Sequence, residues 1–204
     1  IYHRGETDFA KMSSISKTMQ AELARHFVVR RPVVERDLQS VDSTRKWLLR
    51  FTDGHQAETV YIPDGDEERG AVCRFCHPAP QLLVLNPTAD EIVGQVMAAR
   101  DAYGEWPTPD DGGRLLSNIV VMGMGEPLYN FENVATALEI LMDGEGIGIS
   151  RRRITLSTSG VVPMMKACGE RLGVNLAVSL HAVTDELRDR LMPINKKYPI
   201  RELI

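Results

Sequence analysis

Two cysteines, Cys73 and Cys76, are separated by two residues in the stretch RGAVCRFCHPAP, residues 69–80. This spacing is typical of a thiol–disulfide pair, of half a zinc site, or of part of an iron–sulfur ligand set. A zinc site needs a second pair of ligands, and the nearby imidazoles are His55 and His77. Two buried thiols with no chemistry are a fourth interpretation. The cysteine pair alone leaves all four open.

Three further polar clusters follow apolar runs that predict strands. They are Gly123–Glu126 after NIVVMGM, Ser157–Ser159 at the end of RRITLSTS, and Ser179–His181 at the end of NLAVSLH. Because the carboxyl ends of parallel strands meet at one edge of a sheet, we expect these clusters to lie together. The cysteine pair stands where an earlier strand would end, so four clusters would share that edge.

The run VVMGMGEP begins like a dinucleotide-binding sequence, with Gly-x-Gly after a buried strand. The third glycine is missing, because Leu128 stands at its position and Pro127 precedes it, which disfavours a dinucleotide. Backbone groups beside the Glu126 carboxylate suit a ligand with an ammonium group. A tight turn with a solvated glutamate is the plainer alternative, just as Ser157 and Ser179 could cap helices.

From Thr88 onward, helices alternate with apolar strands, which predicts an α/β fold with a parallel sheet and right-handed crossovers. Thr88 and Glu91 form a capping box. The expected helices cover residues 88–104, 130–144, 161–173 and 184–192, and the expected strands cover 118–124, 152–159 and 175–181. The pattern fits both an open doubly wound sheet and part of a β/α barrel. Cys168, among apolar neighbours, is predicted to be a core residue.

Residues 1–63 predict a small α+β appendage, with a helix over 8–27 and a hairpin over 45–63 around Asp53-Gly54. We therefore divide the chain into residues 1–63 and 64–204. Ile1 at one end and the sequence PIRELI at the other suggest an interior fragment of a longer protein.

The composition is that of a globular protein, with 43% hydrophobic and 25% charged residues. No apolar run reaches membrane-spanning length, and three cysteines make no disulfide framework, so we expect a cytoplasmic protein without a membrane partner. The net charge of −4 argues against a general polyanion binder. The basic groups at residues 25–31, 151–153 and 195–201 are interpreted as solvated faces when taken alone.

Several stretches together resemble one family, the radical S-adenosylmethionine RNA methyltransferases that methylate C2 of adenine in 23S ribosomal RNA and tRNA. These stretches are VYIPDGDEERG, CRFCH, NPTADEIVGQVMAARDA, NIVVMGMGEPLYNFENV, GISRRRITLSTSGVVP, NLAVSLHA and RDRLMPINKKYPI. The resemblance implies a partial β/α barrel of the radical S-adenosylmethionine type. It also implies a [4Fe-4S] cluster, two molecules of S-adenosylmethionine, an external electron donor, and 23S rRNA and tRNA as substrates.

The resemblance also assigns roles to individual residues. Cys73 and Cys76 match the second and third cluster cysteines, and Glu58 matches the proton acceptor. The residues that match cofactor contacts are Gly125 and Glu126 at the methionine end, and Ser157, Ser179, Leu180 and His181 elsewhere. Arg151–Arg153 and Lys196–Lys197 are expected to contact RNA phosphates.

The chain departs from this pattern where the first cluster cysteine should stand, because Arg69 occupies that position. The strand that leads into the cluster is also expected to be missing, between Arg69-Gly70 and Cys73. The methyl-carrying cysteine near the family's C-terminus has no match, and Cys168 does not correspond to it. We therefore expect an enzyme by family whose 204 residues alone transfer no methyl group. The alternative is a truncated or decayed relative that binds S-adenosylmethionine or RNA without catalysis.

Overall fold

The computed structural model describes residues 1–63, 70–76, 86–109, 113–122 and 125–204, with residues 70–76 described as backbone. In this part of the chain, seven strands form one sheet in the order β1 to β7. They are β1 (Val33–Gln39), β2 (Arg45–Arg50), β3 (Gln56–Pro63), β4 (Gly70–Cys76), β5 (Leu116–Val121), β6 (Ile154–Thr158) and β7 (Asn175–Val178). Strands β1 to β4 pair antiparallel, and β4 to β7 pair parallel.

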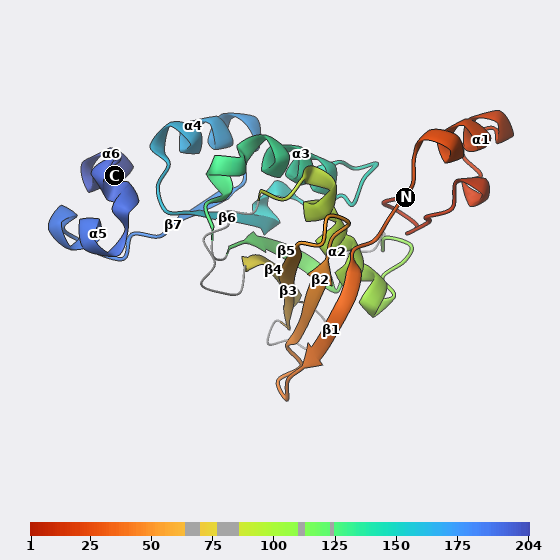
Figure 1. The fold of residues 1–204 in the computed structure, drawn as a ribbon, viewed down its shortest axis with the longest axis horizontal. Coiled ribbons are helices and arrows are strands. Elements are labelled where there is room, and N and C mark those ends of the chain that lie inside the picture. Colours follow the sequence, from red (N-terminus) through yellow and green to blue (C-terminus); the bar gives the residue numbers. More distant parts are fainter. Residues whose placement is uncertain (64–69, 77–85, 110–112, 123–124) are drawn as a thin grey trace.

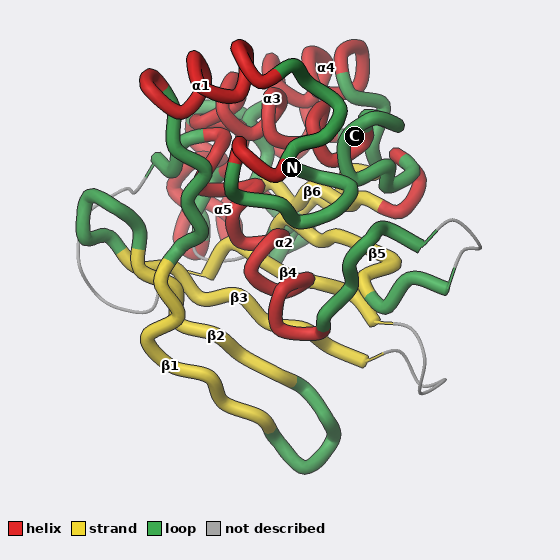
Figure 2. The backbone as a smooth tube through the Cα atoms, turned by 90° about the vertical axis from the view of Figure 1, so that its right-hand side faces the viewer, coloured by secondary structure: helices red, strands yellow, loops and turns green. Residues whose placement is uncertain are grey.

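Helices α3 and α4 lie along one side of the sheet, while the β1–β2 hairpin extends away from them (Figures 1 and 2). The helices are α1 (Lys17–His26), α2 (Ala89–Tyr103), α3 (Phe131–Met142), α4 (Val162–Arg171), α5 (Asp185–Leu191) and α6 (Ile200–Leu203). Short 3-10 turns occur at η1 (Phe9–Lys11), η2 (Pro127–Asn130), η3 (Arg151–Arg153) and η4 (Pro193–Lys196). Helices α1 and α5 lie at opposite ends of the molecule (Figure 1).

The core lies between the sheet and helices α2, α3 and α4. Val134, Leu138 and Leu141 of α3 are fully buried, and their spacing of three and four residues places them on one face of the helix. Burial of each such side chain stabilises the folded state by about 1.5–3 kcal/mol. Helix α2 is anchored by the hydrogen bond from the Thr59 hydroxyl to the Gln95 amide oxygen, at 3.0 Å.

The opposite face of the sheet is half-buried and more polar. In β3, Thr59 and Tyr61 are buried, whereas Glu58 and Val60 between them are only half-buried. The same alternation occurs in β5 and β6, because successive side chains in a strand point to opposite faces. The half-buried positions in these strands include Asn118, Val120, Thr155 and Ser157.

The α/β class and the parallel strands after residue 88 are confirmed, as is the capping box of α2. The prediction of one helix over residues 8–27 is wrong. Met12 is extended and the Ser16 hydroxyl accepts from the Met19 N–H, so η1 and α1 are separate. The third parallel strand was predicted to reach His181, but β7 ends at Val178.

Strand β1 has no counterpart in the sequence prediction. All seven of its residues are exposed, so no alternation of apolar and polar residues marks it. Strand β3 ends at Pro63, where the expected domain boundary lies. It pairs with β4, so residues on both sides of that boundary belong to the same sheet. The division into two domains at that point stays a prediction.

Candidate functional site

The Glu126 carboxylate joins the segment after β5 to the end of β6. Its Oε1 accepts from the Leu128 N–H at 3.0 Å and from the Thr158 hydroxyl at 2.9 Å. Its Oε2 accepts from the Ser159 N–H at 2.6 Å and from the Ser159 hydroxyl at 2.5 Å. A carboxylate offers about four lone-pair positions, so these donors use all of them.

Strands β6 and β7 bring their terminal segments together at the same edge. Ser157 pairs with Ala177 in the parallel register, and the Ser179 N–H donates to the Thr158 carbonyl at 2.8 Å. Thr158 therefore connects the predicted residues. It is hydrogen-bonded to both Glu126 and Ser179, and it follows Ser157 in the chain. The prediction that separate clusters converge on the carboxyl edge is fulfilled for these three segments.

The backbone turns sharply at His181. The Ala182 N–H donates to the Leu180 carbonyl at 2.7 Å, and His181 has a φ of 57°. A three-residue turn with positive φ is rare and strained for a residue with a side chain. His181 is exposed, so its imidazole is available to a ligand at this edge.

Cys73 and Cys76 lie within β4, where the register with β3 is irregular. Cys73 is opposite Val60 and Cys76 is opposite Glu58, so β4 has one residue more than β3 in this interval. Because of this extra residue, Cys73 and Cys76 both pair with half-buried residues of β3.

Glu58 belongs to the same half-buried face. Its Oε1 accepts from the Lys46 ammonium at 3.1 Å, and its side chain is 22% exposed. Lys46 is on the neighbouring strand β2 and is 42% exposed. The role of Glu58 as a proton acceptor stays a prediction.

The donor set does not fit a cluster held by three thiolates. Cys168 is fully buried in α4, within the helix layer, and burial raises the pKa of its thiol. It is confirmed as a core residue. Elsewhere in the described ranges, no group of three His, Cys, Asp or Glu residues is placed to hold a metal. Arg69, His77 and Gly123 lie outside the described residues.

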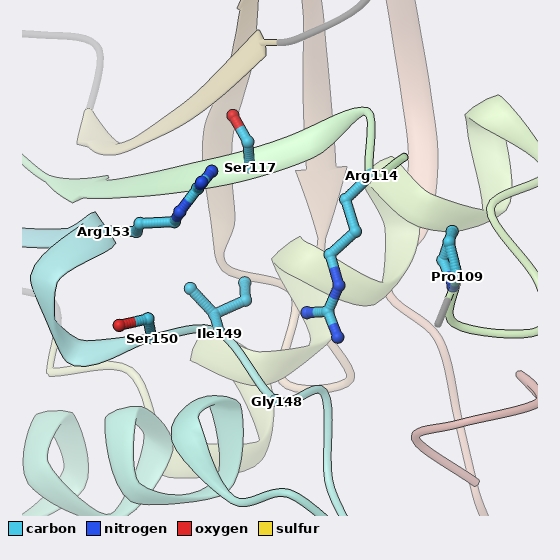
Figure 3. Close-up of a pocket in the computed structure, with 7 residues that line it drawn as sticks. All are labelled: Pro109, Arg114, Ser117, Gly148, Ile149, Ser150 and Arg153. Atoms are coloured by element: carbon cyan, nitrogen blue, oxygen red, sulfur yellow. The ribbon is translucent and has the colours of Figure 1, made fainter. Parts of the chain in front are cut away.

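A pocket of about 250 Å³ lies at the amino ends of β5 and β6, away from the candidate site (Figure 3). Arg153 points toward Ser117, while the Arg114 guanidinium donates to the Ile147 carbonyl at 2.8 Å. A second pocket, of about 470 Å³, lies between η2 and the start of α4. Neither pocket contains any of the predicted cofactor contacts.

Sequence reasoning missed Arg188, which is fully buried and donates to the carbonyls of Ser159 and Leu180 at 2.6 and 3.0 Å. The stretch TDELRDRLM looks like a solvated, charged helix, so no periodicity distinguishes this arginine from Arg190.

In the described helices, none is long and apolar enough to cross a membrane.

No family model matches the chain. The chain is 76% identical to the dual-specificity RNA methyltransferase RlmN of Paramagnetospirillum magneticum, across 100% of the chain and 47% of that relative. It is 67% identical to the protein of the same name from Granulibacter bethesdensis, across 100% of the chain and 54% of the relative. The chain thus spans about half the length of the curated relatives it matches. The first of these alignments covers 215 positions, more than the 204 residues of the chain. The relative therefore has residues in this span without a counterpart here.

The fold is also similar to the crystal structure of a radical SAM methyltransferase from Sphaerobacter thermophilus. The TM-score is 0.80 and the sequence identity is 38%, and the match covers 99% of this chain and 61% of that one.

Proposed function

The chain belongs to the family of dual-specificity RNA methyltransferases RlmN, and we propose that it forms the part of such an enzyme that binds S-adenosylmethionine. The whole protein would methylate C2 of adenine in 23S rRNA and tRNA, with electrons from an external donor. The sheet would be the first part of a β/α barrel, with the half-buried face of β3 to β7 inside. The polar character of that face supports this arrangement.

The single observation that carries the proposal is the hydrogen-bonded junction of three strand ends at one edge. The backbone of Gly125 and Glu126 would meet the methionine end of the cofactor. The hydroxyls of Ser157 and Ser179 and the imidazole of His181 would provide further contacts, together with the backbone of Leu180. Edges of this kind are where parallel α/β sheets bind ligands.

Glu58 would act on the same half-buried face, as a base toward the RNA substrate. The contact of its carboxylate with the Lys46 ammonium, at 3.1 Å, holds the Glu58 side chain on this face. Arg151–Arg153 and Lys196–Lys197 would contact RNA phosphates, since all five of these residues are exposed.

A second function is favoured by the cysteines. Since two thiolates do not complete a three-thiolate set, the chain would bind S-adenosylmethionine or RNA without transferring a methyl group. We therefore propose no methyl transfer by these 204 residues alone. Catalysis would depend on thiolates that this chain does not supply.

Gly125 provides a test of the cofactor site. A Cβ atom added at Gly125 has no described atom within 4 Å, so Gly125→Ala would add a methyl group at the proposed cofactor contact without displacing a described residue. We expect the variant to fold normally and to bind S-adenosylmethionine roughly tenfold more weakly in titration calorimetry. Gly144→Ala is the matched control, because that position is equally open and lies beyond α3. Equal affinity of Gly125→Ala and the wild type, or no binding by the wild type, would contradict the proposal.

A further inference from the structure

The backbone of Ser159 is held between two side chains of opposite charge. Its N–H and hydroxyl donate to the Glu126 carboxylate, and its carbonyl accepts from Arg188 Nη2 at 2.6 Å. Glu126 follows β5, Ser159 follows β6 and Arg188 lies in α5. The carboxylate binds the peptide group before Ser159 and the guanidinium binds the peptide group after it, so the backbone is fixed on both sides of this residue.

Arg188 extends this connection to the end of β7. Its Nε donates to the Leu180 carbonyl at 3.0 Å, and its Nη2 lies 3.3 Å from the Ser179 carbonyl. The guanidinium is planar with fixed donor directions, so one side chain fixes the spacing of all these carbonyls. A lysine ammonium at the same place could not reach them together.

The charge of Arg188 is balanced indirectly. In the described part of the chain, no carboxylate lies within ion-pair distance of its guanidinium, although Arg188 is fully buried. Its Nη1 donates to the Asn195 amide oxygen at 2.7 Å. The Asn195 amide group in turn donates to the carboxylates of Asp185 and Asp189, at 2.9 and 2.7 Å. Arg188 is thus committed to carbonyl groups rather than to an acid.

The strained turn at His181 is stabilised by a hydrogen bond from Arg188. The Leu180 carbonyl that closes the turn accepts from both the Ala182 N–H and Arg188 Nε. A residue held at positive φ persists only when the surrounding contacts over-determine it. Arg188 supplies one of those contacts from a separate helix.

We propose that Glu126, Ser159 and Arg188 form a positioning strap that holds the ends of β5, β6 and β7 in the arrangement needed by the methionine end and the further contacts of S-adenosylmethionine. This inference rests on the proposed function. The carboxylate of Glu126 and the guanidinium of Arg188 are positioning groups, since their hydrogen bonds are made to backbone groups and side chains of the protein itself. The cofactor meets the Gly125–Glu126 backbone and the Ser179–His181 segment that the strap fixes.

The strap is tested with Arg188→Lys and Glu126→Gln, alone and together. Arg190→Lys and Glu186→Gln are the matched controls, because both residues are exposed on the same helix α5. S-Adenosylmethionine affinity is measured by titration calorimetry at a temperature where circular dichroism shows every variant folded. We expect each strap variant to bind roughly tenfold more weakly, and the double variant to bind little worse than the weaker single one.

A merely structural role gives a different result. The variants would then melt at a lower temperature, and the folded protein would keep the wild-type affinity, which would overturn the strap. Fully additive losses of affinity would also overturn it, since the two side chains would then act independently.

Failure of the proposed function is distinguished by amide hydrogen exchange at Ser159 and Ser179 in the ligand-free protein. If the wild type binds no S-adenosylmethionine, the proposed function fails. The amide exchange rates then decide alone whether the strap exists. Exchange at both amides that is roughly tenfold faster in Arg188→Lys, and unchanged in Arg190→Lys, supports the strap. Unchanged exchange in Arg188→Lys overturns it.

Discussion

At the scale of single residues, burial explains why Cys168 is not a candidate for cluster chemistry. Cys168 is fully buried, and burial raises the pKa of its thiol, which disfavours the reactive thiolate. Its neighbours in the sequence already indicated a core position. The same reasoning failed for Arg188, because a buried arginine in a charged helix leaves no trace in hydrophobic periodicity.

The accessibility of Cys168 gives the first prediction. Alkylation of Cys168 by iodoacetamide at pH 8 should be at least roughly tenfold slower in the folded protein than in concentrated urea. Peptide mass spectrometry over a time course measures the rate at this residue alone. Equal rates in the two conditions would show that Cys168 is not in the core.

At the scale of elements, glycines mark where turns must leave their strands. Gly160 follows β6 with a φ of 107°, and a Cβ there would lie 2.6 Å from Leu203 Cδ2. The sequence SerThrSerGly predicted a strand end at this point. It did not predict that α6 would pack on the turn, because that contact joins residues far apart in the chain.

Replacement of two glycines should therefore have opposite effects on the free energy of unfolding. Gly160→Ala should destabilise the protein by about 1–2 kcal/mol, because its φ is unfavourable for a residue with a side chain. Gly169→Ala, within α4 and with no described atom within 4 Å of the new Cβ, should stabilise it by about 0.5–1 kcal/mol. Urea unfolding of both variants measures these changes, and a stable Gly160→Ala protein would refute the assigned turn.

The β1–β2 hairpin contains an ion pair that predicts a dependence on pH. The Arg45 guanidinium donates to both carboxylate oxygens of Asp37, at 2.8 and 2.6 Å, and lowers the pKa of that carboxyl. A lowered pKa in the folded state stabilises the fold above the ordinary carboxyl pKa, and this contribution is lost as the pH falls.

Asp37→Asn should accordingly destabilise the protein more at pH 7 than at pH 2.5. The loss at pH 7 should be at most about 1 kcal/mol, because the Asp37 side chain is 40% exposed and solvent screens the pair. Urea unfolding at the two pH values, with Asp42→Asn in the neighbouring turn as a comparison, checks this. An equal loss for Asp37→Asn at both values would assign the effect to packing instead.

At the scale of the whole molecule, the sequence was sufficient for the order of strands and helices after Thr88 and for the edge where polar groups gather. The strong apolar runs and the capping box carry that information locally. The exposed strand β1 and the break before α1 were not predictable in this way. Their positions depend on strand pairing and on a serine cap rather than on a buried apolar face.

The central proposal is that the chain binds S-adenosylmethionine at the edge formed by the ends of β5, β6 and β7 but supplies only two cysteines in the candidate cluster region. Anaerobic reconstitution with iron and sulfide, followed by iron analysis and EPR of the reduced protein, tests this claim most directly. We predict no cluster signal that shifts when S-adenosylmethionine is added, because two thiolates leave the ligand set incomplete. About four irons per chain, with an EPR signal that shifts with S-adenosylmethionine and disappears in Cys73→Ala, would contradict the account.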